Sequence, residues 1–185
     1  MNSNYLESTR KQFRYYKSLA DKTFVVLNDD DIHWRNVEAQ NNIVTLVKHM
    51  AGNMLSRFTN FLSEDGEKDW RNRDDEFEDT LATKDEMITY WDKGWNCLFN
   101  SIDNLSPNDL ERIIYIRNEG HTVLEALNRQ MAHYAYHVGQ IVFIGKLLKG
   151  DQWNSLTIPK GASKDFNKEK FNQNKERRHF TDDAI

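Results

Sequence analysis

The segment from Gly120 to Gly150 constrains the fold of this chain more than any other, because it predicts one long helix. Thr122 and Glu125 match a capping box, in which a hydroxyl and a carboxylate each accept a hydrogen bond from a backbone N–H of the first turn. Gly150 can end the helix in a left-handed conformation. Between these ends, apolar or small residues recur at steps of three and four, as in a helix that packs in a bundle: Leu124, Leu127, Met131, Tyr134, Val138, Ile141, Gly145 and Leu148.

Two histidines of this predicted helix, His133 and His137, lie at the margin of its apolar face. They are one helical turn apart, so their imidazoles could share one metal ion. The chain has six histidines, and such a pair arises by chance too often to identify a metal site alone. A third ligand is needed.

Three further segments show apolar residues at helical spacing. They predict helices at about 4–27 and 42–62, and a third that starts at a capping box formed by Thr83 and Glu86 and continues to about Leu105. Asp29, Asp30 and Asp31 are expected to end the first helix. The residues at 112–120 are short and β-branched, which predicts an extended segment before the long helix.

The segments between and after these helices differ strongly in charge. Residues 63–82 carry nine Asp or Glu against three Lys or Arg, which predicts a loop with a mostly solvated surface. Trp70 and Phe77 indicate that the loop is held against the body rather than disordered. In the tail, residues 160–180 carry seven Lys or Arg against three Asp or Glu. A partly mobile terminus is the simpler interpretation of this tail, although it could also pair with the acidic loop.

These patterns together predict an all-α fold. We expect a four-helix bundle in a single domain spanning residues 1–185, with a long acidic loop between helices 2 and 3 and a basic, less regular tail at 151–185. The length of 185 residues suits one domain.

Composition excludes several classes of protein. The net charge of −4 and the pI near 5.9 argue against a nucleic-acid binder. No apolar run is long enough for a membrane span, and the polar N-terminal residues do not resemble a signal peptide, so we expect a cytoplasmic protein. The single cysteine, Cys97, excludes an internal disulfide and a cysteine-rich zinc site, and it is expected to be a small packing residue rather than a nucleophile.

His49 is the candidate third ligand. It sits at the margin of the apolar face of the predicted helix 42–62, as His133 and His137 do on theirs, so packing these two helices together could bring all three imidazoles to one ion. The spacing permits this arrangement without requiring it. His33 and His121 are expected in turns or at the surface, and His121 is a poor candidate for a general base.

Other metal motifs do not fit the chain. A zincin requires Glu directly after the first histidine of its motif, and here Tyr134 follows His133. Ferritin-like di-iron sites need Glu-x-x-His pairs on two helices of the bundle, and the one such pair in this chain, Glu176 and His179, lies in the basic tail. Three histidines would leave a fourth position open for water or substrate, as in catalytic rather than structural zinc sites.

The residues around these histidines resemble a known family. KHMAGNMLSRF around His49 and NRQMAHYAYHVGQI around His133 and His137 are similar to the DinB/YfiT-like superfamily of bacterial metal-binding four-helix bundles. The resemblance extends over nearly the whole chain, and DGEKDWRNRDDEFED at 65–79 and LTIPKGASKDFN at 156–167 look specific to one uncharacterised branch. It implies that His49, His133 and His137 are the metal ligands.

The resemblance also implies a function. Characterised members of the superfamily include thiol-dependent transferases and isomerases that use low-molecular-weight thiols such as bacillithiol or mycothiol. The chain is therefore expected to bind a divalent ion, zinc or nickel, and to use a small thiol as an S-transferase. A non-catalytic, stress-related metal-binding or protein-interaction bundle stays open as the alternative. Small-molecule substrates are the expected partners, and a homodimer is left open because the superfamily often forms dimers.

Overall fold

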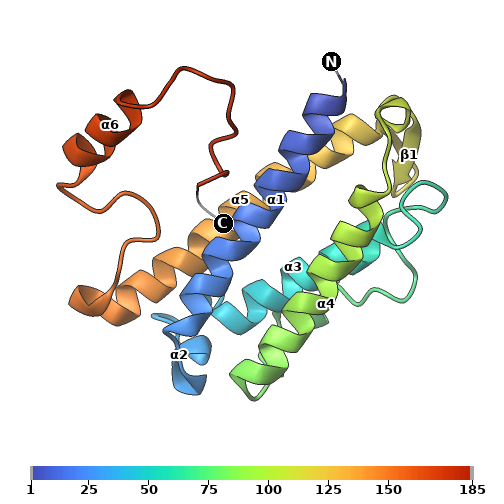
Figure 1. The fold of residues 1–185 in the computed structure, drawn as a ribbon. Helices are drawn as coiled ribbons and strands as arrows, with labels where there is room; N and C mark the ends of the chain where they lie inside the picture. Colours follow the sequence, from blue (N-terminus) through green and yellow to red (C-terminus); the bar gives the residue numbers. More distant parts are fainter. Residues whose placement is uncertain (1, 184–185) are drawn as a thin grey trace.

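The computed structural model describes residues 2–183 and is mostly helical, with one small sheet (Figure 1). Its elements in chain order are α1 (Asn2–Val25), α2 (Asp29–His33), α3 (Ile43–Phe58), η1 (Asp75–Phe77), α4 (Lys84–Asp103), η2 (Pro107–Asp109), β1 (Ile113–Ile116), β2 (Glu119–Thr122), α5 (Val123–Lys149), η3 (Gly150–Gln152) and α6 (Ser163–Phe171). The extended segment predicted before the long helix is the antiparallel hairpin β1–β2.

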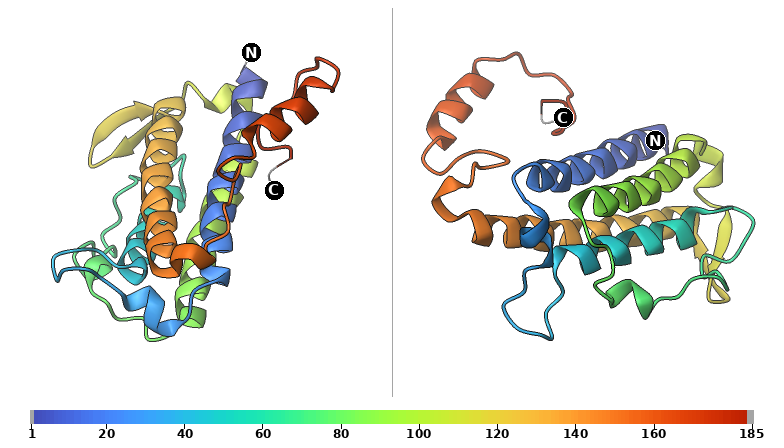
Figure 2. Two further views of the ribbon diagram at one scale, coloured as in Figure 1. Left: turned by 90° about the vertical axis from the view of Figure 1, so that its left-hand side faces the viewer. Right: turned by 90° about the horizontal axis from the view of Figure 1, so that it is seen from below.

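The four long helices pack side by side (Figures 1 and 2). α3 lies along α4 and α1 lies along α5, while α3 also contacts α5 and α1 contacts α4. Their shared interior is apolar, and its largest side chains are aromatic. Phe13 of α1, Trp95 of α4 and Tyr134 of α5 form a cluster of three rings, with centroids 6.3, 6.0 and 5.9 Å apart. In residues 2–183 no helix is both long and apolar enough to cross a membrane.

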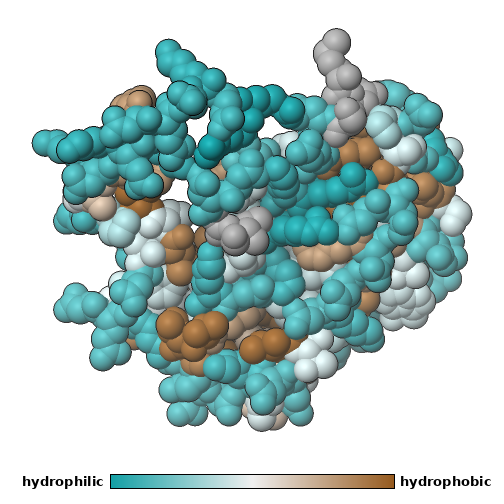
Figure 3. Space-filling model, viewed as in Figure 1, coloured by the Kyte–Doolittle hydropathy of each residue, from teal (hydrophilic) through white to brown (hydrophobic). Residues whose placement is uncertain are grey.

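A glycine sets how closely α3 and α4 approach. A Cβ added to Gly94 of α4 would lie 2.7 Å from the Cα of Ala51 on α3. Such contacts are shorter than real Cβ atoms allow, so glycine is required there. The face of the molecule seen in Figure 3 is mostly hydrophilic, with separate hydrophobic patches, as expected once the apolar faces of the helices are packed together.

The predicted start of the long helix is confirmed. Thr122 and Glu125 form the capping box, α5 runs to Lys149, and Gly150 follows with a positive φ of 49°. Thr83 likewise caps α4 by accepting from the N–H of Glu86, but the Glu86 carboxylate accepts from Ala82 rather than completing the box.

The first helix ends at Val25, close to the predicted end, but the role of the acidic residues after it and the predicted end of the second helix need correction. Asp29–Asp31 do not merely end the first helix. Asn28 caps a new short helix, α2, which has these acidic residues in its first turn, where carboxylates favour the positive helix end. The second helix ends at Phe58 rather than near Leu62, because Thr59 is extended and Asn60 has a φ of 50°.

The acidic loop, residues 63–82, is held against the body as predicted, but by only one of the two expected aromatic residues. Trp70 is 60% exposed and does not pin it, whereas Phe77 stacks on His49. At its start, Asp65 accepts hydrogen bonds from the backbone N–H groups of Arg117 and Asn118 in the β1–β2 turn. Phe77 is therefore one of the two expected aromatic anchors, and charged and polar contacts take the place of Trp70.

The tail, in the part that the structure describes up to residue 183, contacts α1 (Figure 2). His179 hydrogen-bonds Ser8 at 3.0 Å, and Asp182 pairs with Lys11 at 2.6 Å. Phe180 meets Tyr15 edge to face, with centroids 5.4 Å apart. The alternative that the basic tail pairs with the acidic loop was wrong, since the two segments lie on different sides of the helices.

Candidate metal centre

The three predicted histidines come together where α3 packs against α5. His49 lies in the middle of α3, and His133 and His137 occupy successive turns of α5. The contact between these helices brings residues 84 positions apart in the chain into direct contact. The sequence expectation that the three imidazoles meet is confirmed.

The three Nε2 atoms face one another. The Nε2 of His133 is 3.2 Å from that of His49 and 3.1 Å from that of His137. One ring nitrogen from each histidine lies within 4.8 Å of the other two. The three rings therefore point at a common position.

The other ring nitrogen of each histidine has its own oxygen partner. Nδ1 of His49 lies 3.0 Å from Glu76 Oε2, and Nδ1 of His137 lies 2.8 Å from Gln140 Oε1. Nδ1 of His133 lies 3.4 Å from Gln130 Oε1. An oxygen acceptor draws the imidazole proton to Nδ1, so we assign all three rings the tautomer that leaves a lone pair on Nε2.

Two of the three histidines are buried and the third is partly so. His49 and His137 are 6% and 5% exposed, and His133 is half-buried. Burial lowers the pKa of His133 to about 3, with the neighbouring His137 and His49 lowering it further. Burial also lowers the pKa of His137 to about 4, although its hydrogen bond to Gln140 opposes this. Both rings are neutral at pH 7, the form that binds metals.

Three ring nitrogens that face one another fit a metal ion. Nitrogen ligands about 2.0–2.1 Å from a tetrahedral zinc ion lie about 3.3 Å apart, close to the 3.1 and 3.2 Å between these nitrogens. No donor faces the three lone pairs among these rings, so a cation would satisfy them all. The cluster of His49, His133 and His137 could therefore hold a metal ion.

Glu76 is the site residue that sequence reasoning missed. Burial would raise its pKa, but hydrogen bonds from His49 and Arg71 outweigh this and hold it below the ordinary value. The interpretation of the loop charges as a solvated surface was wrong for this residue, which is only 5% exposed. Among nine acidic residues in one loop, no spacing or periodicity distinguishes Glu76.

Aromatic rings border the cluster. Phe77 stacks on His49 at a centroid distance of 4.9 Å, and Tyr136 lies 4.0 Å from His137 and 5.6 Å from His133. Tyr136 is largely exposed and His133 half-exposed, so solvent reaches the site on this side of α5.

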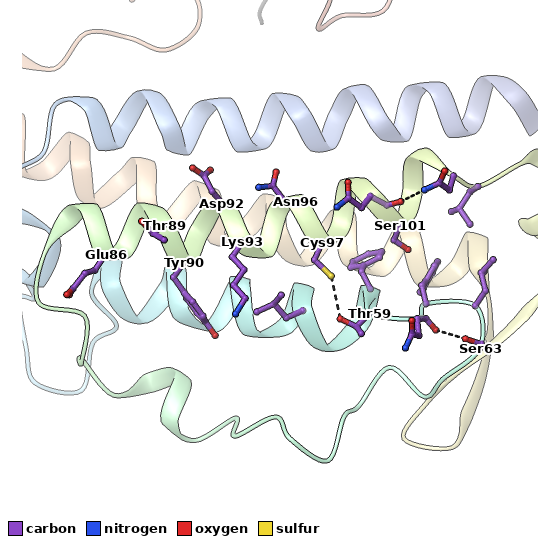
Figure 4. Close-up of a pocket in the computed structure, with 18 of the residues that line it drawn as sticks. Thr59, Ser63, Glu86, Thr89, Tyr90, Asp92, Lys93, Asn96, Cys97 and Ser101 are labelled. Atoms are coloured by element: carbon purple, nitrogen blue, oxygen red, sulfur yellow. Dashed lines mark hydrogen bonds between the residues drawn. The ribbon is translucent and has the colours of Figure 1, made fainter.

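Cys97 lies elsewhere, in a groove of about 1700 Å³ between α3 and α4 (Figure 4). It is half-buried, and its sulfur is 3.6 Å from the hydroxyl of Thr59. None of the three clustered histidines lines this groove. The groove and its cysteine are thus separate from the groups that can do metal chemistry.

The remaining histidines of the first half and the hairpin have structural positions. His33 ends α2 and contacts Asp79 of the acidic loop at 2.8 Å. His121 lies in β2, half-buried, and its Nε2 has no hydrogen-bond partner within residues 2–183. Neither joins the metal cluster.

Comparison with known proteins identifies the family without a function. The chain matches the family described as "Protein of unknown function (DUF1572)" over residues 1–162. No curated protein and no solved structure matches it significantly. The match includes all three clustered histidines and the whole of α1 to α5. The chain therefore belongs to the DUF1572 family.

Proposed function

We propose that His49, His133 and His137 are the ligands of one divalent ion, zinc or nickel, in a metal-dependent enzyme. The observation that carries this proposal is the convergence of three Nε2 atoms whose rings each have an oxygen partner at Nδ1. Metal-binding histidines typically show this arrangement, because the second nitrogen fixes the tautomer and orients the ring. Imidazole ligands accept zinc and nickel alike.

We also propose that the four long helices form a DinB-like four-helix bundle in one domain. The pairing of α1 with α5 and α3 with α4 supports this, as do the sequence motifs around the three histidines. By that resemblance, the reaction is transfer involving a low-molecular-weight thiol of the bacillithiol type. A divalent ion bound by three neutral histidines would keep an open position and lower the pKa of a thiol that entered it.

The chain itself supplies the surroundings for such a reaction. Phe77 and Tyr136 place aromatic rings beside the cluster. The half-exposed His133 marks the side from which a small molecule could approach. Because Cys97 lies in a separate groove, the thiol would come from a small molecule and not from the protein.

The partners proposed from composition are small molecules rather than nucleic acids or membranes, in a cytoplasmic protein. A homodimer is part of the same proposal by resemblance. The alternative function is a non-catalytic metal-binding or protein-interaction bundle. It is favoured by the low exposure of His49 and His137, which leaves little room at the ion.

Thiol-dependent turnover would separate these two functions. Turnover of a chloro-dinitro arene is measured with wild-type protein loaded with zinc or nickel, and with chelated protein for comparison. Each is assayed with bacillithiol, with another thiol and without thiol. We expect turnover that needs both metal and thiol, survives Cys97→Ser and is abolished by His133→Ala, because two remaining ligands hold the ion weakly. If loaded wild type is no faster than His133→Ala with every thiol, the transferase proposal gives way to the binding-module alternative.

A further inference from the structure

We propose that Glu76, carried by the acidic loop, is a positioning residue of the metal centre. It holds His49 with its proton on Nδ1 and its Nε2 facing His133 and His137. This inference rests on the proposed metal site, and it makes residues 75–80 part of that site rather than a surface loop.

The other contacts of Glu76 mean that it can only accept a hydrogen bond from His49. Arg71 donates to both of its carboxylate oxygens, from Nε at 2.7 Å and from Nη2 at 2.9 Å. The side chains of Arg71 and Glu76 are only 2% and 6% exposed. A carboxylate in such a two-bonded pair with arginine is acceptor-only. The Nδ1 of His49, 3.0 Å from Oε2, must therefore donate to it.

Helix α3 has a space for this carboxylate. Gly52 lies three residues after His49, and a Cβ added there would be 2.3 Å from Glu76 Oε1 and 2.8 Å from its Cδ. Glycine is unfavourable in a helix interior, so its presence at this position needs a local reason. Room for the Glu76 carboxylate beside His49 is such a reason.

The residue before His49 fixes the backbone that carries Glu76. Lys48 Nζ donates to the carbonyl oxygens of Asp75 and Glu78, at 2.6 and 2.8 Å, and to the hydroxyl of Thr80 at 2.7 Å. Both sides of Glu76 are thus held by one lysine of α3. Two consecutive residues of α3 therefore contact this part of the loop. Lys48 donates to its backbone, and His49 donates to the Glu76 carboxylate.

Removing the charge of Glu76 tests the role directly. In Glu76→Gln the amide offers one acceptor oxygen, for which Arg71 and His49 would compete, while its NH2 group faces donors. We expect about 10- to 100-fold weaker zinc affinity, measured by competition with a chromophoric chelator. Glu78→Gln is the matched control, since it makes the same charge change two residues away at an exposed position, and it should bind zinc as wild type does.

Displacing Glu76 without changing any charge gives a second, independent test. In Gly52→Ala the new methyl group would push the carboxylate away from His49, while alanine favours the helix itself. Zinc affinity should fall although the helix gains. Gly139→Ala in α5 is the control, because a Cβ there meets nothing within 4 Å. It should leave zinc affinity unchanged.

Nitrogen NMR of the metal-free protein reports the position of the proton. We expect the His49 ring in wild type to carry its proton on Nδ1, and to show a mixture of both tautomers in Glu76→Gln and Gly52→Ala. A wild type that binds no zinc would refute the proposed function, but this measurement would still decide on Glu76. The positioning role is overturned if wild-type His49 is protonated on Nε2, or if wild type binds zinc and both variants bind it as tightly.

Discussion

Substituting Arg71 by methionine should destabilise the protein severely, because it would leave Glu76 as an unpaired charge beneath the acidic loop. The pair is buried on both sides, with 2% and 6% of the two side chains exposed. Its two hydrogen bonds are 2.7 and 2.9 Å long. After the substitution, His49 Nδ1 would be the remaining donor to Glu76.

The expected size follows from this burial. Breaking a buried ion pair by removing one partner costs about 3–5 kcal/mol, because the other charge loses both water and partner. That is a large share of the roughly 5–15 kcal/mol that stabilises a typical domain. Removing both charges should cost far less. The double variant Arg71→Met with Glu76→Gln, which keeps an acceptor for His49, should lie within about 1–2 kcal/mol of wild type.

Urea denaturation of wild type, both single variants and the double variant measures these free energies of unfolding as a double-mutant cycle. A chelator is present throughout, so that metal binding adds nothing to stability. Arg178→Met is the control, because its pair with Glu176 is at the surface, and its free energy of unfolding should stay close to that of wild type. The reasoning is refuted if Arg71→Met costs less than about 1 kcal/mol or if the double variant is no better than Arg71→Met.

Two further predictions concern packing and pH. Gly94→Ala should lower the free energy of unfolding by about 1–3 kcal/mol in denaturant titrations, since its Cβ would meet the backbone of Ala51, whereas Gly139→Ala should raise it by about 0.5–1 kcal/mol. Burial opposes a low pKa for Asp65, but hydrogen bonds from three backbone N–H groups hold that pKa below its ordinary value. Its contribution is present above about pH 4 and lost as the pH falls through the lower folded pKa. Unfolding curves of Asp65→Asn should therefore lose less stability than wild type below about pH 4; equal losses would contradict this.

The long helix and its ends could be read from sequence because their causes are local. Thr122 and Glu125 are three residues apart and bond each other's turn. Gly150 supplies the positive φ that follows the last turn. The apolar spacing in between needs only the geometry of a helix. The capping of α2 by Asn28 is equally local, but Asp29, Asp30 and Asp31 were interpreted only as the end of the first helix.

Two of the three histidines of the cluster could also be placed together from the sequence. One helical turn separates His133 from His137, so their proximity follows from α5 alone. His49 could be assigned only as a candidate, because its distance to them depends on how α3 packs against α5. Resemblance to a family supplied what spacing left open. The predicted burial of loop residues failed for a related reason. The aromatic Trp70 is exposed to solvent, whereas the charged Glu76 is buried.

Neighbouring residues along the chain are enough to specify the helices, their caps and one pair of histidines, because hydrogen bonds and side-chain spacing within a turn are local. The burial of Glu76 beside His49 depends instead on how distant segments pack. Burying a carboxylate costs much free energy unless hydrogen-bond donors are placed to pair with it. These donors come from Arg71 and from α3, and the room for the carboxylate comes from Gly52. The donors and this space come together only where the loop packs against α3.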